Sequence, residues 1–116
     1  MGETLLGKAA LCAAAKKELR IKHATQDIEE NVEEVVSSAL DDMSMRNVDT
    51  ARICPDGVAI SEMKPLGVRA VKFYVKANYG ISSKDDAGTR ARYQACYDAL
   101  VNSMSLSREY RKMDGD

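Results

Sequence analysis

Paired acidic residues are the first feature of this sequence that could do chemistry. Glu29 and Glu33 are four residues apart, as are Glu30 and Glu34, so each pair lies on one face of a helix. Two carboxylates placed in this way can act as general acid and base, or can share a metal ion. No Glu-x-x-His pattern accompanies them, and exposed acids are routine on amphipathic helices. We therefore interpret the four glutamates as a solvated acidic face and expect no metal there.

Side chains that could serve as a base or a nucleophile are few and widely separated. The one histidine, His23, lies in a polar connection, and the chain has no glycine-rich phosphate loop and no G-x-S-x-G motif. Cys12 and Cys96 stand at apolar helical positions, which predicts buried, inert thiols, and nothing near Cys54 would activate it. An odd number of separated cysteines is typical of a reduced, intracellular chain. The sequence predicts no catalytic residue and no cofactor.

A second charged pattern has the opposite sign. Arg69, Lys72 and Lys76 recur at helical spacing and form what we call the basic stripe. The acidic face and the basic stripe could pair within one subunit or between copies. A contact between copies would be heterologous, and repeated heterologous contacts close into a ring or continue as a filament. Two ordinary solvated faces would explain the same charges equally well.

Two helices are expected in the first half of the chain, and the second of them carries the acidic face. The first covers about residues 5–20, which are rich in Ala and Leu and have cations in the last turn. The second begins at Asp27, with Glu30 completing a capping box, or at Thr25 as the competing N-cap. It extends over about 18 residues with one apolar stripe. The stripe consists of Ile28, Val32, Val35, Val36, Ala39, Leu40 and Met43.

Two more helices are expected in the second half of the chain. The third begins at Pro65, whose missing N–H would be unpaired at a first helical position anyway, and stops at Gly80. Its expected apolar face holds Leu66, Ala70, Phe73, Tyr74 and Ala77. The fourth is capped by Asp85 or Asp86, and its apolar positions are Tyr93, Cys96, Tyr97, Leu100, Val101 and Met104. After about residue 105 the sequence predicts an irregular charged tail with mobile last residues.

The connection between residues 47 and 64 interrupts the helical pattern. Pro55, Asp56 and Gly57 separate two short β-branched pieces, residues 52–54 and 58–60. This arrangement predicts a turn and is compatible with a short β-hairpin. The expected fold is therefore all-α, a small bundle of about four helices in a single domain that includes this long connection.

Composition agrees with such a fold and excludes several classes of protein. A chain of 116 residues fits one domain, and 45% hydrophobic with 30% charged residues is typical of a globular protein. Aromatic residues make up 5%, so that the core must consist of aliphatic side chains and Met, which favours helices. A net charge of −1 is not that of a basic nucleic-acid clamp. The longest apolar run, residues 9–15, is too short to cross a bilayer.

Three stretches of the sequence carry a resemblance to a known family. They are KELRI at residues 17–21, PL at 65–66 followed by AVKFYVKANYG at 70–80, and YDAL at 97–100 leading to LSREYR at 106–111. Together they resemble the head-tail connector proteins of long-tailed bacteriophages, also described as head-completion or DNA-packaging adaptor proteins. The resemblance covers residues 5–111, and YVKANYG and SLSREYR are its most specific parts.

The resemblance implies a structural subunit without enzymatic activity. Such subunits are all-α and assemble into a ring of about twelve copies beneath the portal protein. The ring extends the channel for double-stranded DNA without sequence-specific binding, and it offers a docking surface to tail or head-completion proteins. The resemblance implies no cofactor and no membrane partner. It places the protein at the head-tail junction of the virion, after synthesis in the cytoplasm of the bacterial host.

The charge pattern and the resemblance combine into one hypothesis about assembly. An acidic channel wall repels phosphates and lets DNA slide, whereas a basic wall would bind them. We therefore expect the four glutamates to face the channel or a subunit contact, with the basic stripe on the opposing surface. Charge reversal of Lys72 and Lys76 is then expected to weaken assembly.

The alternative is a small helical nucleic-acid-binding module that acts in packaging or regulation. In this interpretation the basic stripe, together with Arg90 and Arg92, contacts phosphates. Binding would then depend steeply on salt concentration. An enzyme would require a pocket of perturbed carboxylates, for which the sequence offers no pattern.

Overall fold

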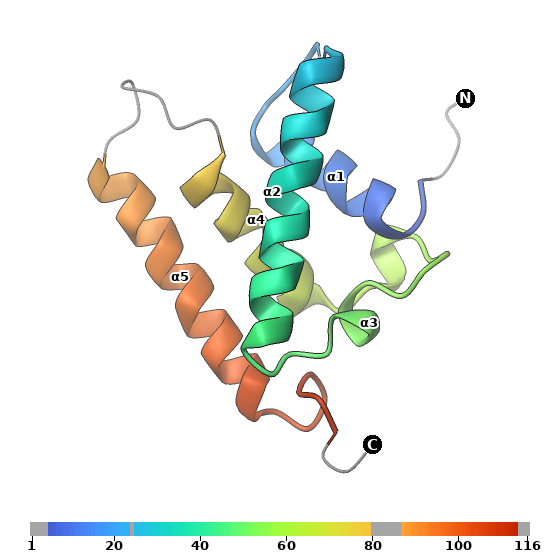
Figure 1. Ribbon diagram of the computed structural model, residues 1–116, viewed down its shortest axis with the longest axis vertical. Helices are drawn as coiled ribbons and strands as arrows, with labels where there is room; N and C mark the ends of the chain where they lie inside the picture. The colour runs from blue at the N-terminus through green and yellow to red at the C-terminus, as the bar shows by residue number, and fades with distance from the viewer. Residues whose placement is uncertain (1–4, 24, 80–86, 114–116) are drawn as a thin grey trace.

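The all-α class is confirmed by the structure, a computed structural model that describes residues 5–23, 25–79 and 87–113. These residues form five α-helices and one 3₁₀ helix, and no strand. Figure 1 shows α2 crossing in front of α1 and α4, with α5 alongside α4 at the edge of the molecule. The elements are α1 (Gly7–Glu18), α2 (Gln26–Met45), α3 (Thr50–Ile53), η1 (Ile60–Glu62), α4 (Pro65–Asn78) and α5 (Ala87–Leu106).

The predicted apolar stripe of α2 is confirmed. Val32, Val36, Ala39 and Met43 are 0% exposed, and the other three members of the stripe pack partly buried against the core. The start of the helix is set by Thr25, whose hydroxyl accepts a hydrogen bond from the Ile28 N–H at 3.3 Å. The capping box expected at Asp27 is therefore wrong, because Asp27 lies inside the first turn.

The helix α4 is the central element of the bundle. It packs against α1, α2, α3 and α5, so it is buried on more than one side. Val68, Val71 and Val75 are buried, as are Ala70 and Ala77. The expected apolar face is confirmed, since Ala70 and Ala77 are buried and its other three members pack partly buried against the core. The prediction missed the second buried side of the helix, which the valines form.

The ends of α4 and α5 agree with the sequence prediction where the structure describes them. Pro65 is the first residue of α4, and the helix ends at Asn78, with Tyr79 as an extended C-cap. The expected stop at Gly80 and the expected caps Asp85 and Asp86 lie outside the described residues. All six predicted apolar positions of α5 are buried or half-buried.

The connection between α2 and α4 contains helical turns in place of the compatible β-hairpin. Asp49 caps α3 by accepting a hydrogen bond from the Ala51 N–H at 3.1 Å, and Ile53 at its end is 0% exposed. The predicted turn is present at Asp56 and Gly57, and Gly57 has a φ of +78°. The β-branched pieces on either side pair with other segments instead of with each other, because Val58 O accepts from the Gly7 N–H at 2.8 Å.

The segment after α5 is irregular, as expected, but it belongs to the folded domain. Tyr110 is only 7% exposed and joins the core. Its carbonyl accepts from the Asp49 N–H at 2.8 Å, and Val48 and Arg111 form an isolated β-bridge. Residues 107–112 therefore close the bundle at the end where α3 lies, and only residues 114–116 of the expected mobile tail lie outside the described part.

A close approach between α3 and α4 gives the first testable prediction. A Cβ atom at Gly67 would lie 2.3 Å from Ile53 Cγ2, so Gly67→Ala forces the buried Ile53 side chain to move. We expect the free energy of unfolding in urea to fall by about 1–3 kcal/mol.

The double variant Gly67→Ala/Ile53→Ala is the matched control for this contact. The new methyl group would occupy part of the space left by Ile53, so the double variant should lose less stability than the two single losses added together. If the losses of stability of the two single variants simply add, Gly67→Ala does not displace Ile53 and the prediction is wrong.

Candidate functional site

The acids of α2 face three directions, which follow from the helical step of about 100° per residue. Glu30, Glu34 and Asp41 lie opposite the buried stripe and are exposed; we call them the outer acidic row. Glu29 and Glu33 lie on the flank that faces α1, where each is paired with a lysine of that helix. The predicted acidic face is therefore divided, and only Glu30 and Glu34 of its four members point straight outward.

The flank of α2 toward α1 is neutralised within the subunit. Glu29 pairs with Lys16, and Glu33 Oε1 lies 4.0 Å from Lys8 Nζ. Both pairs are partly open to solvent, so each contributes little to stability. Two of the four predicted glutamates therefore have a lysine of the same subunit as their partner and are less available to another molecule.

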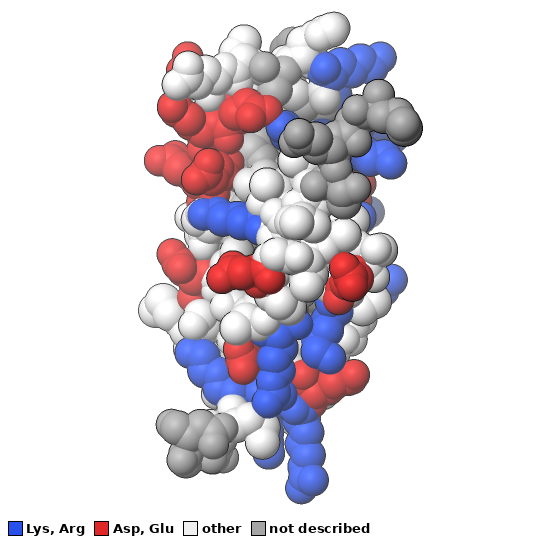
Figure 2. Space-filling model, turned by 90° about the vertical axis from the view of Figure 1, so that its right-hand side faces the viewer, with Lys and Arg blue, Asp and Glu red and all other residues white. Residues whose placement is uncertain are grey.

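The outer acidic row keeps its charge. Glu30 accepts one hydrogen bond, from Gln26 Nε2 at 3.4 Å, and within the described residues neither Glu34 nor Asp41 forms an ion pair. Ser37 and Ser38 lie between them along the same shallow hollow of α2. In Figure 2, acidic side chains gather in the upper half of the molecule along one edge. Carboxylates in such a row are available to cations of another molecule.

The basic stripe of α4 is also divided. Lys76 Nζ lies 3.7 Å from Glu18 Oε1 and 5.0 Å from the centre of the Tyr93 ring, so it links α1, α4 and α5. Arg69 and Lys72 form no ion pair within the described part of the chain. The acids of α2 and the basic stripe thus both pair with α1, and no ion pair among the described residues joins them to each other.

The open side of α4 borders a groove that it shares with α1 and η1. The groove consists of two adjoining hollows of about 530 and 500 Å³, and Glu18, Ile60 and Lys72 line both. Its walls are partly apolar, and Ile60 is 37% exposed. Arg69, Lys72 and Lys17 supply cations along it. We call this the α4 groove; its apolar lining includes Ala10, Ala13 and Ala14 of α1, Ile60, and Val68 and Phe73 of α4.

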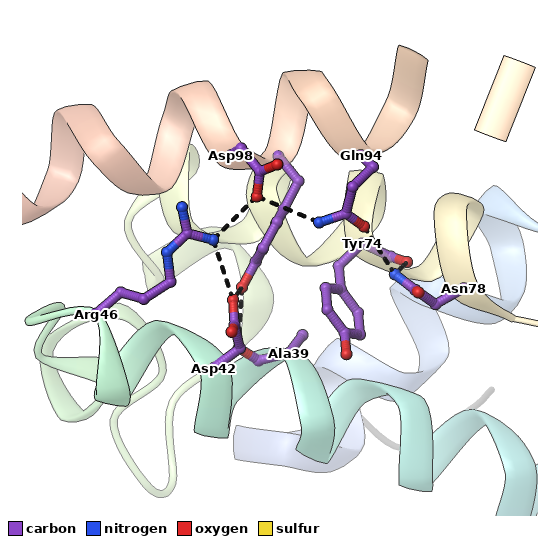
Figure 3. A network of polar contacts seen from close by, with 8 residues as sticks. Ala39, Asp42, Arg46, Tyr74, Asn78, Gln94 and Asp98 are labelled. Atoms are coloured by element: carbon purple, nitrogen blue, oxygen red, sulfur yellow. Dashed lines mark hydrogen bonds and ion pairs between the residues drawn. The ribbon is translucent and has the colours of Figure 1, made fainter. Parts of the chain in front are cut away.

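A polar network that sequence reasoning missed joins α2 to α5. The buried Tyr97 donates its O–H to Asp42 Oδ2 at 2.6 Å. Arg46 Nη1 donates to the same oxygen at 3.3 Å and to Asp98 Oδ1 at 2.9 Å. The carboxylate of Asp98 also accepts from Gln94 Nε2 at 3.2 Å (Figure 3). The network therefore fixes the position of α2, and of the outer acidic row on it, relative to α5.

The network holds the Tyr97 hydroxyl in its neutral form. Burial, followed by the hydrogen bond to Asp42, raises the pKa of Tyr97 far above its usual range, so the hydroxyl stays protonated. The Tyr74 ring meets the Tyr97 ring edge-on at a centroid distance of 5.0 Å, which closes the site from the α4 side. The one signal in the sequence was a basic residue, Arg46, at the end of an otherwise acidic helix.

Two of the three thiols are less acidic than a free cysteine. Cys12, Cys54 and Cys96 are unpaired and half-buried. Burial raises the pKa of the Cys12 and Cys54 thiols, which lowers their thiolate fraction at neutral pH. Among the described residues, no three His, Cys, Asp or Glu side chains are grouped to hold a metal ion. No helix in the same part of the chain is long and apolar enough to span a membrane.

Comparison with known proteins found no matching family model, no matching curated protein and no matching solved structure. The geometry above and the sequence resemblance are therefore the observations from which a function can be argued.

The Tyr97 hydroxyl predicts how stability depends on pH. The folded state holds this proton more tightly than the unfolded state, so its contribution is complete below pH 10 and is lost above it. From this group alone, the free energy of unfolding should fall by up to about 1.4 kcal/mol per pH unit above pH 10. Tyr97→Phe should cost about 1.5–3 kcal/mol at pH 8 and should show a shallower decline above pH 10.

Val101→Ala is the matched control, because it removes buried packing one turn along α5 and keeps the hydroxyl. It should be less stable at pH 8 and decline above pH 10 as steeply as the wild type in urea titrations. Equal slopes for wild type and Tyr97→Phe would contradict the assignment.

Proposed function

We propose that the protein is a structural, non-enzymatic subunit that assembles with copies of itself into a closed ring. In this proposal the ring is the head-tail connector of a long-tailed bacteriophage. The observation that carries the proposal is the presence of two complementary surfaces, the outer acidic row and the α4 groove. Neither the row nor the groove cations Arg69 and Lys72 form ion pairs within the described part of the subunit.

The two surfaces suit a heterologous contact between neighbouring copies. The row lies on the outside of α2, whereas the groove lies on the open side of α4 against α1. Carboxylates of one copy can pair with Arg69 and Lys72 of the next, and the alanines of α1 allow close approach of another chain. Because the two surfaces differ, each added copy still presents one free surface of each kind, and the repeated contact closes into a ring when the rotation between neighbours divides a full turn.

The connector role rests on the resemblance of residues 5–111 to that family. In this role about twelve copies form the ring beneath the portal protein at the head-tail junction of the virion. Double-stranded DNA passes through the ring without sequence-specific binding, and tail or head-completion proteins dock on it. Acids that the ring leaves uncovered would keep the channel wall from binding phosphates.

Nucleic-acid binding through the basic stripe is less well supported. Lys76 is already paired with Glu18, and Arg90 donates from Nη1 to the Ala77 carbonyl at 3.1 Å. Two of the cations on which that alternative depends therefore have partners within the subunit.

The direct test of the proposed function is the assembly state of the purified protein. Light scattering, sedimentation and negative-stain imaging should show closed rings of one size at micromolar concentration or above. A protein that stays monomeric at every accessible concentration would contradict the proposal.

Charge reversal tests the two surfaces within the ring. Arg69→Glu/Lys72→Glu places acids opposite acids, so the concentration needed for assembly should rise by about tenfold or more. Glu30→Lys/Glu34→Lys should weaken assembly in the same way. Mixing the two variants, whose altered surfaces are complementary, should restore assembly, as measured by sedimentation.

The control variant is Lys22→Glu/Arg92→Glu, which changes the net charge as much as Arg69→Glu/Lys72→Glu at two exposed positions outside the groove lining. It should assemble as the wild type does. Rings that survive reversal of Arg69 and Lys72 would place the subunit contact elsewhere while leaving the ring itself intact.

A further inference from the structure

One end of the molecule carries a second surface that the sequence did not indicate. Figure 1 shows α2 and α5 ending at the same end, beside α3 and the C-terminal segment. Three large apolar side chains are exposed where these segments end: Met45 at 86%, Leu106 at 74% and Met113 at 50%. Exposed apolar groups that gather on one surface mark interaction sites more often than scattered ones do.

Asn47 joins the three segments that carry these apolar side chains. Its Nδ2 donates to the Ser105 carbonyl at 3.3 Å, and its own carbonyl accepts from the Lys112 N–H at 3.1 Å. The residue has a φ of +71°, a left-handed conformation that Asn adopts more readily than most residues. These contacts bring the ends of α2 and α5 and the C-terminal segment together, so Met45, Leu106 and Met113 belong to the same end of the molecule.

Cations belong to the same end of the molecule. Arg52 donates from Nη1 to the Arg108 carbonyl at 3.0 Å, which holds the turn after α5, and Val48 pairs with Arg111. In Figure 2, Lys and Arg side chains gather at this lower end of the molecule. We call the whole surface the terminal patch; its members are Met45, Leu106, Met113, Arg108, Arg111 and Lys112.

The three cations of the terminal patch have no ion-pair partner within the described residues. Two acids of the neighbouring segments pair with other cations, Asp49 with Arg52 at 3.4 Å and Glu109 with Lys64 at 3.5 Å. The Arg111 Nε is buried and has no hydrogen-bond acceptor. The Arg111 side chain is only half-buried, so the outer nitrogens of its guanidinium can donate to an external carboxylate.

We propose that the terminal patch is a docking surface for an acidic protein segment that presents apolar side chains among its carboxylates. Met and Arg are the residue types enriched at protein interfaces, and guanidinium groups bind carboxylates in bidentate geometry. A phosphate backbone would pair with the cations but would leave Met45 and Leu106 exposed to water. The combination of apolar and cationic groups therefore favours a protein partner over nucleic acid.

The inference deepens the proposed function and rests on it for the kind of partner, a neighbouring protein of the head-tail junction. The subunit contact proposed above uses Glu30 and Glu34 in the first half of α2 together with the α4 groove, whereas the terminal patch lies at the other end of α2. The experiment below measures the surface directly and does not require a ring.

The probe is a fluorescent peptide of about 15 residues that alternates pairs of Glu with Leu, added to the full-length protein and followed by anisotropy. The wild type should bind it. Arg108→Glu/Lys112→Glu and Met45→Ser/Leu106→Ser should each weaken binding by about tenfold, because the first changes two of the three cations and the second two of the three apolar side chains. A Lys/Leu peptide of the same length should not bind, and Arg69→Glu/Lys72→Glu should bind as the wild type does.

A duplex DNA of about 20 base pairs serves as the competing probe. If DNA binds and the Glu/Leu peptide does not, or if Met45→Ser/Leu106→Ser binds the peptide as well as the wild type does, the proposal is overturned. Circular dichroism spectra that match the wild type would show that each variant is folded. Loss of peptide binding with rings intact would refute the docking surface alone, whereas peptide binding by a protein that forms no ring would refute only the assembly.

Discussion

The packing of α4 is the constraint on which the rest of the structure depends. Four helices surround it, so only one of its sides can face solvent. Small residues make this close packing possible. Gly67 contacts Ile53, and Ala70 and Ala77 are buried where larger side chains would hold the neighbouring helices further from α4. The basic stripe must then lie on the remaining side, beside α1 and η1, where the α4 groove forms. The position of the cations follows from the packing of the core.

The same logic orders the acids of α2. The buried stripe and the Tyr97–Asp42–Arg46 contacts fix the rotation of the helix, so each acid has a defined neighbourhood. Lysines of α1 pair with the acids on one flank of α2, and Tyr97 of α5 donates a hydrogen bond to Asp42 on the other flank. What remains outward is a row of carboxylates on one side and a pair of cations on another. A net charge of −1 therefore conceals a subunit with separated surfaces of opposite sign.

Local patterns predicted the helices, but contacts between helices decided the site. The stripe of α2 and the start at Pro65 could be predicted, because periodicity and the geometry of proline are local properties. The side of α4 that holds Val68, Val71 and Val75 was not predicted, because a helix buried on two sides shows more than the single apolar stripe that the pattern describes. The residues around Ile53 have a strand-like composition but form a helical turn. Asp49 caps this turn, and the Ile53 side chain packs against Gly67 of α4. Which glutamates stay free depends on Lys8 and Lys16, more than a dozen residues away in sequence.

The central claim is that the outer acidic row of one copy meets the α4 groove of the next. Zero-length carbodiimide cross-linking of a mixture of ¹⁴N-labelled and ¹⁵N-labelled protein, followed by mass spectrometry, tests it most directly. The account predicts a cross-link between Glu30 or Glu34 and Lys72 that occurs in peptide pairs of mixed isotope. Absence of this pair from cross-linked assemblies, or its occurrence only with a single isotope, would contradict the account.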